Sequence, residues 1–167
     1  DQTQWMLDIL DDPARTGVAV VTTPEEMPVT ETIELLARLR AETGAHASAV
    51  IANRVLPAMF NRREQAIVDR LDDVMPLLVD AIGPGARTVV DAARLTESRR
   101  ATGATHLDRL RAWIEDADEV PDQLPIITVP ELFARASGPR VVSLVADALT
   151  DELDPEPMPS AGRSGTP

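Results

Sequence analysis

Three short apolar segments divide the chain and set its expected architecture. They are Val18–Val21, Ala49–Ala52 and Ile126–Val129, and none of them alternates regularly between apolar and polar residues. Continuous β-branched runs of this length are typical of strands that are buried on both faces of a parallel sheet. We therefore expect three parallel strands, each covered by helices on both sides.

Between the first two strands the apolar residues change to helical spacing. Thr30 is the expected N-cap of this helix, and Gly44, which tolerates a left-handed backbone, is its expected end. The helix would present an apolar stripe formed by Ile33, Leu36 and Leu39. Residues 18–53 therefore have the order strand, helix, strand and the length of a βαβ crossover.

The segment from about residue 58 to residue 120 is expected to be a helical insertion. Pro76 either kinks or restarts its first helix, and Gly83–Gly85 ends that helix. Two more helices are expected over residues 86–100 and 105–117. The first helix carries an apolar stripe that either packs into the core, the preferred interpretation, or faces a partner. The residues at helical spacing in it are Phe60, Ile67, Leu71, Val74, Leu78 and Ile82.

A final amphipathic helix is expected after the third strand, where apolar residues recur at helical spacing between Val141 and Leu149. Pro, Ser, Gly and Glu dominate beyond it, so residues 154–167 are expected to form a disordered tail. Residues 1–153 would then form one α/β unit. Because a sheet of three strands leaves two unpaired edges, this unit alone is expected to be sticky or unstable.

The charge and composition of the chain exclude several classes of function. A formal net charge of −12 disfavours binding to nucleic acid and to anionic membrane surfaces. The absence of cysteine excludes disulfides and thiolate zinc sites, and His46 and His106 have no partner at ligand spacing. No apolar run approaches the roughly 20 residues that span a bilayer, and residues 1–12 do not resemble a signal peptide. We therefore expect a cytoplasmic protein without a metal site or a nucleic-acid partner.

The chain also has no loop that could hold a nucleotide's phosphates. All 16 basic residues counted as lysine or arginine are arginine, whereas a phosphate-binding loop needs a lysine on the β- and γ-phosphates. Gly83–Gly85 is too short and too rich in proline to replace it, and no serine nucleophile elbow occurs. No catalytic residue is therefore expected in this chain.

Three segments nevertheless resemble a known family in their order and spacing. They are Thr22–Thr32, Val50–Pro57 and Val129–Gly138, and each follows the carboxyl end of an expected strand, where open α/β sheets bind ligands. Over residues 18–149 the chain resembles the C-terminal half of the anion-transporting ATPases. This P-loop NTPase family includes the arsenite-pump ATPase and the ATPase that targets tail-anchored proteins. The long insertion and the lysine-free composition resemble its actinobacterial members.

This resemblance implies a partial P-loop NTPase fold, with three α/β/α layers around a parallel sheet. It implies ATP and Mg²⁺ as ligands, with the phosphate loop and the Mg²⁺ ligands upstream of Asp1. In the family, an asparagine at the position of Asn53 hydrogen-bonds adenine, and its carboxamide offers both a donor and an acceptor for this. The other residues that the resemblance places at the nucleotide are Arg54, Pro130, Glu131 and Leu132. The alternative is that Asn53 only caps a turn before Arg54.

The family pattern is not matched everywhere. Gly138 fits it, but Arg135 stands where the family has a glutamate, and the zinc-binding Cys-x-x-Cys that would follow Asn53 is absent. Arsenite needs soft ligands such as thiolates, so arsenite transport is not supported. Pro24-Glu25 and Glu31 match a Pro-Glu pair and a following Glu of the family. The role that the resemblance implies for them is structural: a turn out of the strand and the start of a helix.

Two functions follow as expectations. The first is the adenine-side half of an ArsA-like ATPase that couples ATP binding and hydrolysis to a conformational change, in transport or in protein targeting. Its partners would be a related ATPase subunit, in a homo- or heterodimer, and a membrane-protein client. The alternative is a partner subunit or interaction module that never hydrolyses ATP.

Overall fold

The structure is a computed structural model that describes residues 2–12, 14–118, 120–121, 124–132 and 138–153. The expected tail, residues 154–167, lies outside the described residues. The elements follow in the order α1 (Gln2–Leu10), β1 (Val18–Thr22), α2 (Glu26–Thr43), β2 (Ala47–Val55), α3 (Arg62–Val68), the 3₁₀ turn η1 (Leu71–Val74), α4 (Met75–Ile82), α5 (Gly85–Asp116), β3 (Ile126–Pro130) and α6 (Pro139–Leu153).

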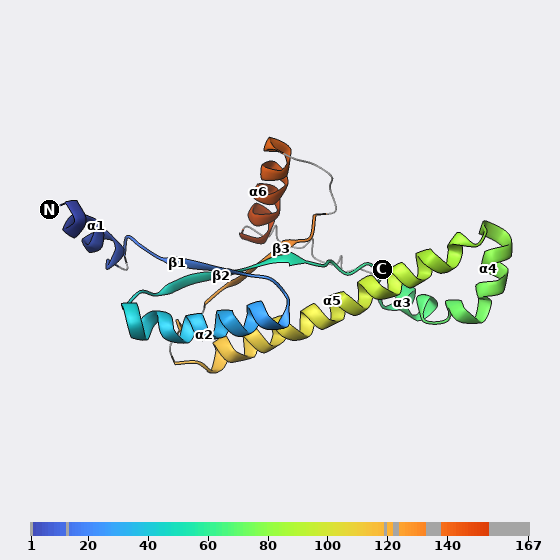
Figure 1. Ribbon diagram of the computed structural model, residues 1–167, viewed down its shortest axis with the longest axis horizontal. Coiled ribbons are helices and arrows are strands. Elements are labelled where there is room, and N and C mark those ends of the chain that lie inside the picture. The colour runs from blue at the N-terminus through green and yellow to red at the C-terminus, as the bar shows by residue number, and fades with distance from the viewer. Residues whose placement is uncertain (1, 13, 119, 122–123, 133–137, 154–167) are drawn as a thin grey trace, which may run out of the picture.

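The described strands form one parallel sheet in the order β1-β2-β3, which confirms the expected parallel strands. Val20 of β1 pairs with Val50 of β2, and Val50 pairs in turn with Ile126 of β3. Both connections therefore cross the sheet in the same direction, from β1 to β2 and from β2 to β3. Because such crossovers are right-handed, they place their helices on the same face. Figure 1 shows this arrangement, with α2 and α5 below the sheet and α6 above it.

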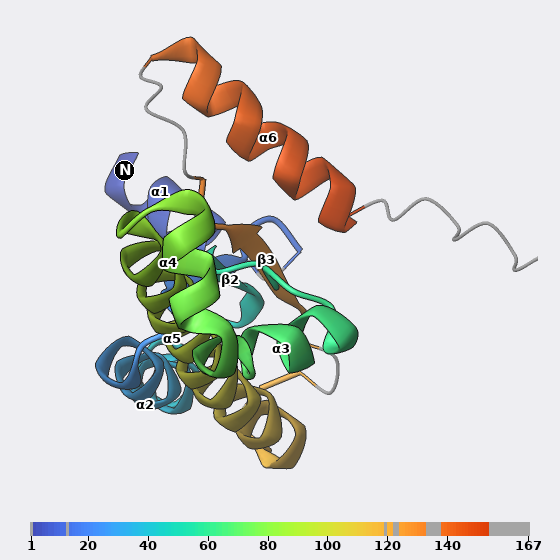
Figure 2. The ribbon, with the colours of Figure 1, turned by 90° about the vertical axis from the view of Figure 1, so that its right-hand side faces the viewer.

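The resulting order of layers is helices, sheet, helix, as expected for a partial P-loop NTPase fold. In the view of Figure 2, α6 again lies on the side of the sheet opposite to α2 and α5. The main core fills the space between the sheet and these two helices. Its fully buried side chains are aliphatic, in keeping with a chain that has only two tryptophans and two phenylalanines. The largest of them are Leu36, Leu110, Val29 and Val50.

The expectation that every strand is buried on both faces is wrong for β1. Val20 and Thr22 are buried, but Ala19 is exposed and Val21 is 62% exposed. Side chains alternate between the faces of a strand, so one face of β1 is covered by α2 while the other is open. The physical reason is that α6, the described helix on that side, packs beside β3 and leaves β1 uncovered.

Helix α5 is continuous, so the expected break between two helices near residues 101–104 is wrong. Gly103 lies inside it and is buried. A Cβ at Gly103 would lie 3.2 Å from both the Cβ and the carbonyl oxygen of Pro24. This glycine therefore allows the helix to approach the loop after β1 closely, and the surrounding helix tolerates its backbone cost of about 1 kcal/mol.

The region α3, η1, α4 and residues 85–98 of α5 projects beyond the sheet, and we call it the helical arm (Figure 1). Pro76 restarts the chain in the first turn of α4, and Gly83–Gly85 separates α4 from α5, both as expected. A small apolar cluster of its own forms inside the arm. It consists of Met75, Ala86 and Val90, with Leu71, Leu78 and Val79 packed against them.

The expected apolar stripe of the arm is not one continuous face. Leu71 and Leu78 pack inside the arm, whereas Ile67 is 62% exposed and Val74 is 40% exposed. The reason is that η1 and the restart at Pro76 shift the phase of the helix, so residues at α-helical spacing in the sequence do not share a face. Core packing thus holds for part of the stripe only, and in a cluster separate from the sheet.

The boundaries of three other helices are informative. Helix α2 begins at Glu26 rather than after Thr30, because Pro28 falls in the first turn, where backbone N–H groups are unpaired anyway. The hydroxyl of Thr30 instead donates to the carbonyl oxygen of Glu26, at 2.8 Å. Gly44 ends α2 in the left-handed conformation, as expected, and α6 contains the expected Val141–Leu149. Helix α1 was not predicted, and it has no buried residue.

The free edge of β3 is occupied by a side chain of α6. The Glu152 carboxylate accepts hydrogen bonds from the backbone N–H of Thr128, at 3.3 Å, and from its hydroxyl, at 2.9 Å. A charged side chain on an edge strand prevents other strands from pairing there. This contact also ties α6 to the sheet.

The fold predicts a large difference between two leucines of the same helix. Leu110→Ala should lower the free energy of unfolding by about 2–5 kcal/mol, because it leaves a cavity in the core between α5 and the sheet. Leu95→Ala, at a leucine that is 64% exposed, should change it by less than about 0.5 kcal/mol. Urea unfolding followed by circular dichroism measures both. Equal losses would contradict the described packing of α5.

Candidate functional site

The carboxyl end of β2 contains a bulge at the expected adenine contact. Ala52 pairs with Thr128 and Val55 pairs with Pro130, so Asn53 and Arg54 together stand opposite Val129. Two residues facing one define a β-bulge, a feature that redirects side chains and is common beside active sites. Arg54 has a φ of 60°, and among the described residues it is the only non-glycine with a positive φ.

The Asn53 side chain is half-buried and partly engaged by its own backbone. Its Oδ1 accepts a hydrogen bond from the backbone N–H of Arg54, at 2.9 Å. This is the contact that a turn-capping asparagine would make. The Nδ2 group has no hydrogen-bond partner among the described residues, so one half of the carboxamide remains able to donate to a ligand.

Arg54 and Glu131, expected at the same site, form an ion pair across 77 residues of sequence. The Arg54 Nε atom lies 2.8 Å from the Glu131 Oε2 atom, and the side chains are 60% and 25% exposed. The hydrogen bond that Arg54 donates to Glu131, and then the charge of Glu131, raise the pKa of the Arg54 guanidinium. The backbone N–H of Glu131 also donates to the carbonyl oxygen of Val55, at 2.9 Å. Two contacts therefore hold the exits of β2 and β3 together.

Beside this ion pair lies a cavity of about 530 Å³. Its size is in the range of pockets that hold small molecules. It lies at the carboxyl end of the sheet and is closed on one side by α5. Its walls come from the loop after β1, the exits of β2 and β3, and α5; they include Pro24, Glu26, Arg54, Leu56, Gly103, Leu107 and Glu131.

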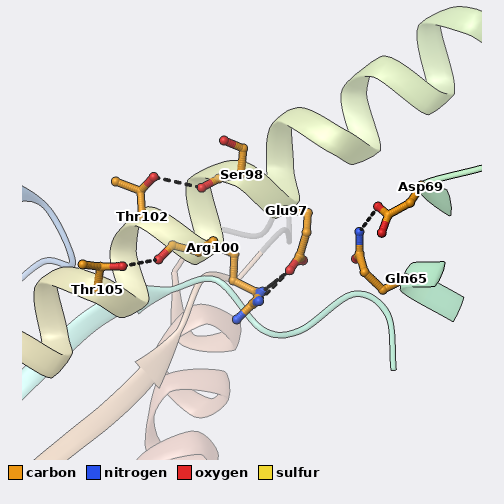
Figure 3. Close-up of polar contacts among 8 residues, drawn as sticks. Gln65, Asp69, Glu97, Ser98, Arg100, Thr102 and Thr105 are labelled. Carbon is orange, nitrogen blue, oxygen red and sulfur yellow. Dashed lines mark hydrogen bonds and ion pairs between the residues drawn. The ribbon is translucent and has the colours of Figure 1, made fainter. Parts of the chain in front are cut away.

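The wall contributed by α5 is organised by ion pairs and hydroxyls along the helix itself. Glu97 and Arg100 pair with 2.8 Å between Oε1 and Nε (Figure 3). This hydrogen bond is the main cause that lowers the pKa of the Glu97 carboxyl. The hydroxyls of Thr102 and Thr105 donate to helix carbonyls four residues earlier, as Figure 3 also shows. These contacts fix the polar groups along this wall.

A second, smaller hollow of about 350 Å³ lies between the exit of β3 and α6. Its lining includes Val55, Pro57, Pro130, Ala148 and Glu152. Val55 and Thr128 belong to both hollows, so the exits of β2 and β3 separate the two.

The structure brings the expected site residues to one edge of the sheet, but not into one cavity. Arg54 and Glu131 line the larger cavity, and Pro130 lines the smaller hollow. Asn53 and the half-buried Leu132 line neither of them. Of the expected wall after Pro130, Arg135 lies outside the described residues. Gly138 has a φ of 70°, which suits a glycine at that position.

Sequence reasoning missed the residues that α5 adds to the larger cavity. Arg100, Gly103, His106 and Leu107 all line it, although they lie in what was expected to be an insertion. They match no motif and are far from Asn53 in the sequence. The one available signal was Gly103, a glycine inside a helical pattern, which often marks the close approach of another segment.

The larger cavity has both charged and apolar walls: Arg54, Arg99, Arg100 and Arg111 line it together with Pro24, Leu56 and Leu107. The described residues contain no group of three or more His, Cys, Asp or Glu that could hold a metal ion. The whole chain lacks lysine. Among the helices in the described part of the chain, none is both long and apolar enough to cross a bilayer.

Comparison with known proteins shows that the first part of the chain is similar to one family. The model of the family described as anion-transporting ATPase matches residues 1–74. The matched stretch contains β1, α2, β2 and the Asn53 bulge, whereas β3 and Pro130 lie beyond it. No curated protein matches the chain. Over its first 74 residues, therefore, the chain resembles the anion-transporting ATPases.

Proposed function

We propose that the chain forms the adenine-side part of an ATPase of the ArsA type. The observation that carries this proposal is the half-buried Asn53, at a strand bulge inside the family match, with an Nδ2 group that no described residue engages. It lies at the carboxyl edge of a parallel sheet, where α/β proteins bind nucleotides. The protein would act in the cytoplasm, where ATP is abundant.

The hydrogen-bonding state of Asn53 suggests how it would distinguish bases. Its Oδ1 is engaged by the Arg54 N–H, so its Nδ2 group acts as a donor toward the ligand. Adenine presents an unprotonated N1, which accepts such a bond. Guanine presents an N1–H at the same position, which would leave two donors facing each other. Pro130 and Leu132, on the neighbouring strand exit, would supply apolar contact to the base.

The triphosphate and Mg²⁺ would be bound by residues outside these 167. Without a lysine, the chain has no group that could reach the β- and γ-phosphates in the manner of a P-loop. A segment or subunit that carries this loop would complete the ATPase. In this arrangement ATP binding joins the two parts, and hydrolysis releases their contact, which couples the reaction to a conformational change.

Because the phosphate site would lie outside these residues, we predict that the chain alone does not hydrolyse ATP. Purified chain assayed with Mg-ATP should give the same rate of phosphate release as buffer. Turnover that stays with the chain through repeated purification, at a constant specific rate, would show that the phosphate site lies within it after all.

Replacing Asn53 should weaken base recognition. In the complete ATPase, Asn53→Ala should reduce ATP affinity by about two- to tenfold, because one hydrogen bond of about 0.5–1.5 kcal/mol is lost. The preference for ATP over GTP should fall as well. Calorimetric titration with both nucleotides measures these effects.

A matched control is Asn61→Ala. Asn61 caps α3 in the helical arm, where its Oδ1 accepts hydrogen bonds from the backbone N–H groups of Arg63 and Glu64. This variant should lose some stability and keep its base preference. If folded Asn53→Ala binds ATP as tightly and as selectively as the parent protein, Asn53 is a turn residue only.

A second candidate function is that of a non-hydrolysing partner subunit, and the exposed surface of the helical arm favours it. Leu77 is 71% exposed, Ile82 is 73% exposed and Val89 is 70% exposed. Exposed apolar side chains in such number on one projection are typical of an interaction surface. A related ATPase subunit, in a homo- or heterodimer, or a membrane-protein client would bind there.

The arm offers a direct test of this docking function. Leu77→Ser with Ile82→Ser should abolish association, measured by light scattering, and leave the melting temperature nearly unchanged. Leu71→Ser with Leu78→Ser, at packed positions of the same arm, should lower the melting temperature instead. Unchanged association in the first variant would remove the arm as the docking surface.

A further inference from the structure

We infer that the Arg54–Glu131 ion pair is a positioning device that holds the bulge of β2 in the shape that aims Asn53 at the base. This inference rests on the proposed nucleotide site and assigns its specificity to a second pair of residues. Arg54 and Glu131 were expected to contact the nucleotide themselves. Their contacts indicate that they act through Asn53 instead.

The backbone of Arg54 is strained. Its φ of 60° lies in the left-handed region, which arginine rarely adopts and glycine adopts freely. Such a conformation persists only when surrounding contacts maintain it, and it is typical of functional sites. The chain keeps an arginine where a glycine would be unstrained. The arginine side chain contributes the bond to Glu131, which a glycine would lack.

Three hydrogen bonds surround this residue. The Arg54 N–H donates to Asn53 Oδ1, the Arg54 Nε donates to Glu131 Oε2, and the Glu131 N–H donates to the Val55 carbonyl oxygen. Together they join both residues of the bulge to the exit of β3. Rotation of the Arg54 peptide would break the bond to Asn53 Oδ1 and release the carboxamide. The pair thus determines which end of the carboxamide remains available.

The contacts and the exposure of the pair distinguish a positioning role from ligand binding and from stabilisation of the fold. The guanidinium is engaged by Glu131 and lines the larger cavity, whereas Asn53 does not line that cavity. Alternation along β2 places Asn53 on the face of Ile51, opposite to the buried Ala52. The Arg54 side chain is also 60% exposed, and ion pairs with an exposed partner contribute little to folding stability. Its contribution is therefore one of geometry.

Three variants of the complete ATPase test the inference. Arg54→Ala removes the ion pair, and alanine is strained at this φ as arginine is, so the backbone should leave this conformation and the ATP-over-GTP preference should fall by about two- to tenfold, as for loss of the Asn53 bond itself. Glu131→Gln should reduce the preference in the same direction. Arg54→Gly also removes the pair, but glycine adopts this φ freely, so the preference should stay near that of the parent protein.

The outcomes are distinct. If Arg54→Gly loses as much preference as Arg54→Ala while its Asn53 side-chain amide signals stay in place, the guanidinium touches the nucleotide and the positioning role is wrong. If Arg54→Ala keeps the full preference, the ion pair has no part in recognition and the inference is also wrong. Melting temperatures within a few degrees of the parent exclude a loss caused by misfolding.

A second measurement does not depend on nucleotide binding. In the 167-residue chain without ligand, the NMR signals of the Asn53 side-chain amide should shift in Arg54→Ala and Glu131→Gln and stay in place in Arg54→Gly. If the complete protein binds no nucleotide but these shifts appear, the proposed function fails while the positioning by the pair stands. If the Asn53 signals are the same in all variants, the pair does not position Asn53.

Discussion

The packing of α2 and α5 against one face of the sheet is the interaction on which the rest of the molecule depends. Both crossovers between parallel strands are right-handed and run in the same direction, so both helices must lie on the same side. Their shared core, with Leu36 and Leu110 fully buried, is the largest apolar cluster of the described residues. It fixes the direction of α5, and α5 is the longest element of the chain.

Much of the functional geometry follows from that one helix. Its second half belongs to the core, its middle forms a wall of the larger cavity, and its first half supports the helical arm. Helix α5 therefore connects the arm to the wall near Gly103, beside the exits of β2 and β3.

Features that depend on neighbouring residues were predictable from the sequence. The apolar runs identify the strands, Gly44 ends α2 and Pro76 restarts the chain, because strand burial, left-handed caps and proline geometry are local effects. The sequence also places Asn53 at the carboxyl end of the central strand. The family resemblance, rather than the pattern, connects that residue to adenine.

Features that depend on distant contacts were not predictable. Gly103 resembles a helix breaker until Pro24 is seen packed against it. The pairing of Arg54 with Glu131 crosses 77 residues, and no periodicity reports it. Val21 has the sequence environment of a buried strand, yet no described helix covers it, so its exposure depends on tertiary structure alone.

Because of the contact between Glu152 and Thr128, the two edge strands of the sheet differ in their ability to accept another strand. Thr128 has its N–H and its hydroxyl engaged by one carboxylate, so another strand could join beside β3 only after α6 had moved. At the opposite edge, β1 pairs within the described residues with β2 alone, and its Val21 side chain is open. Any additional strand, whether from a longer chain or from a second protein, would therefore extend the sheet from β1 and leave β3 and α6 at the far side of the assembly.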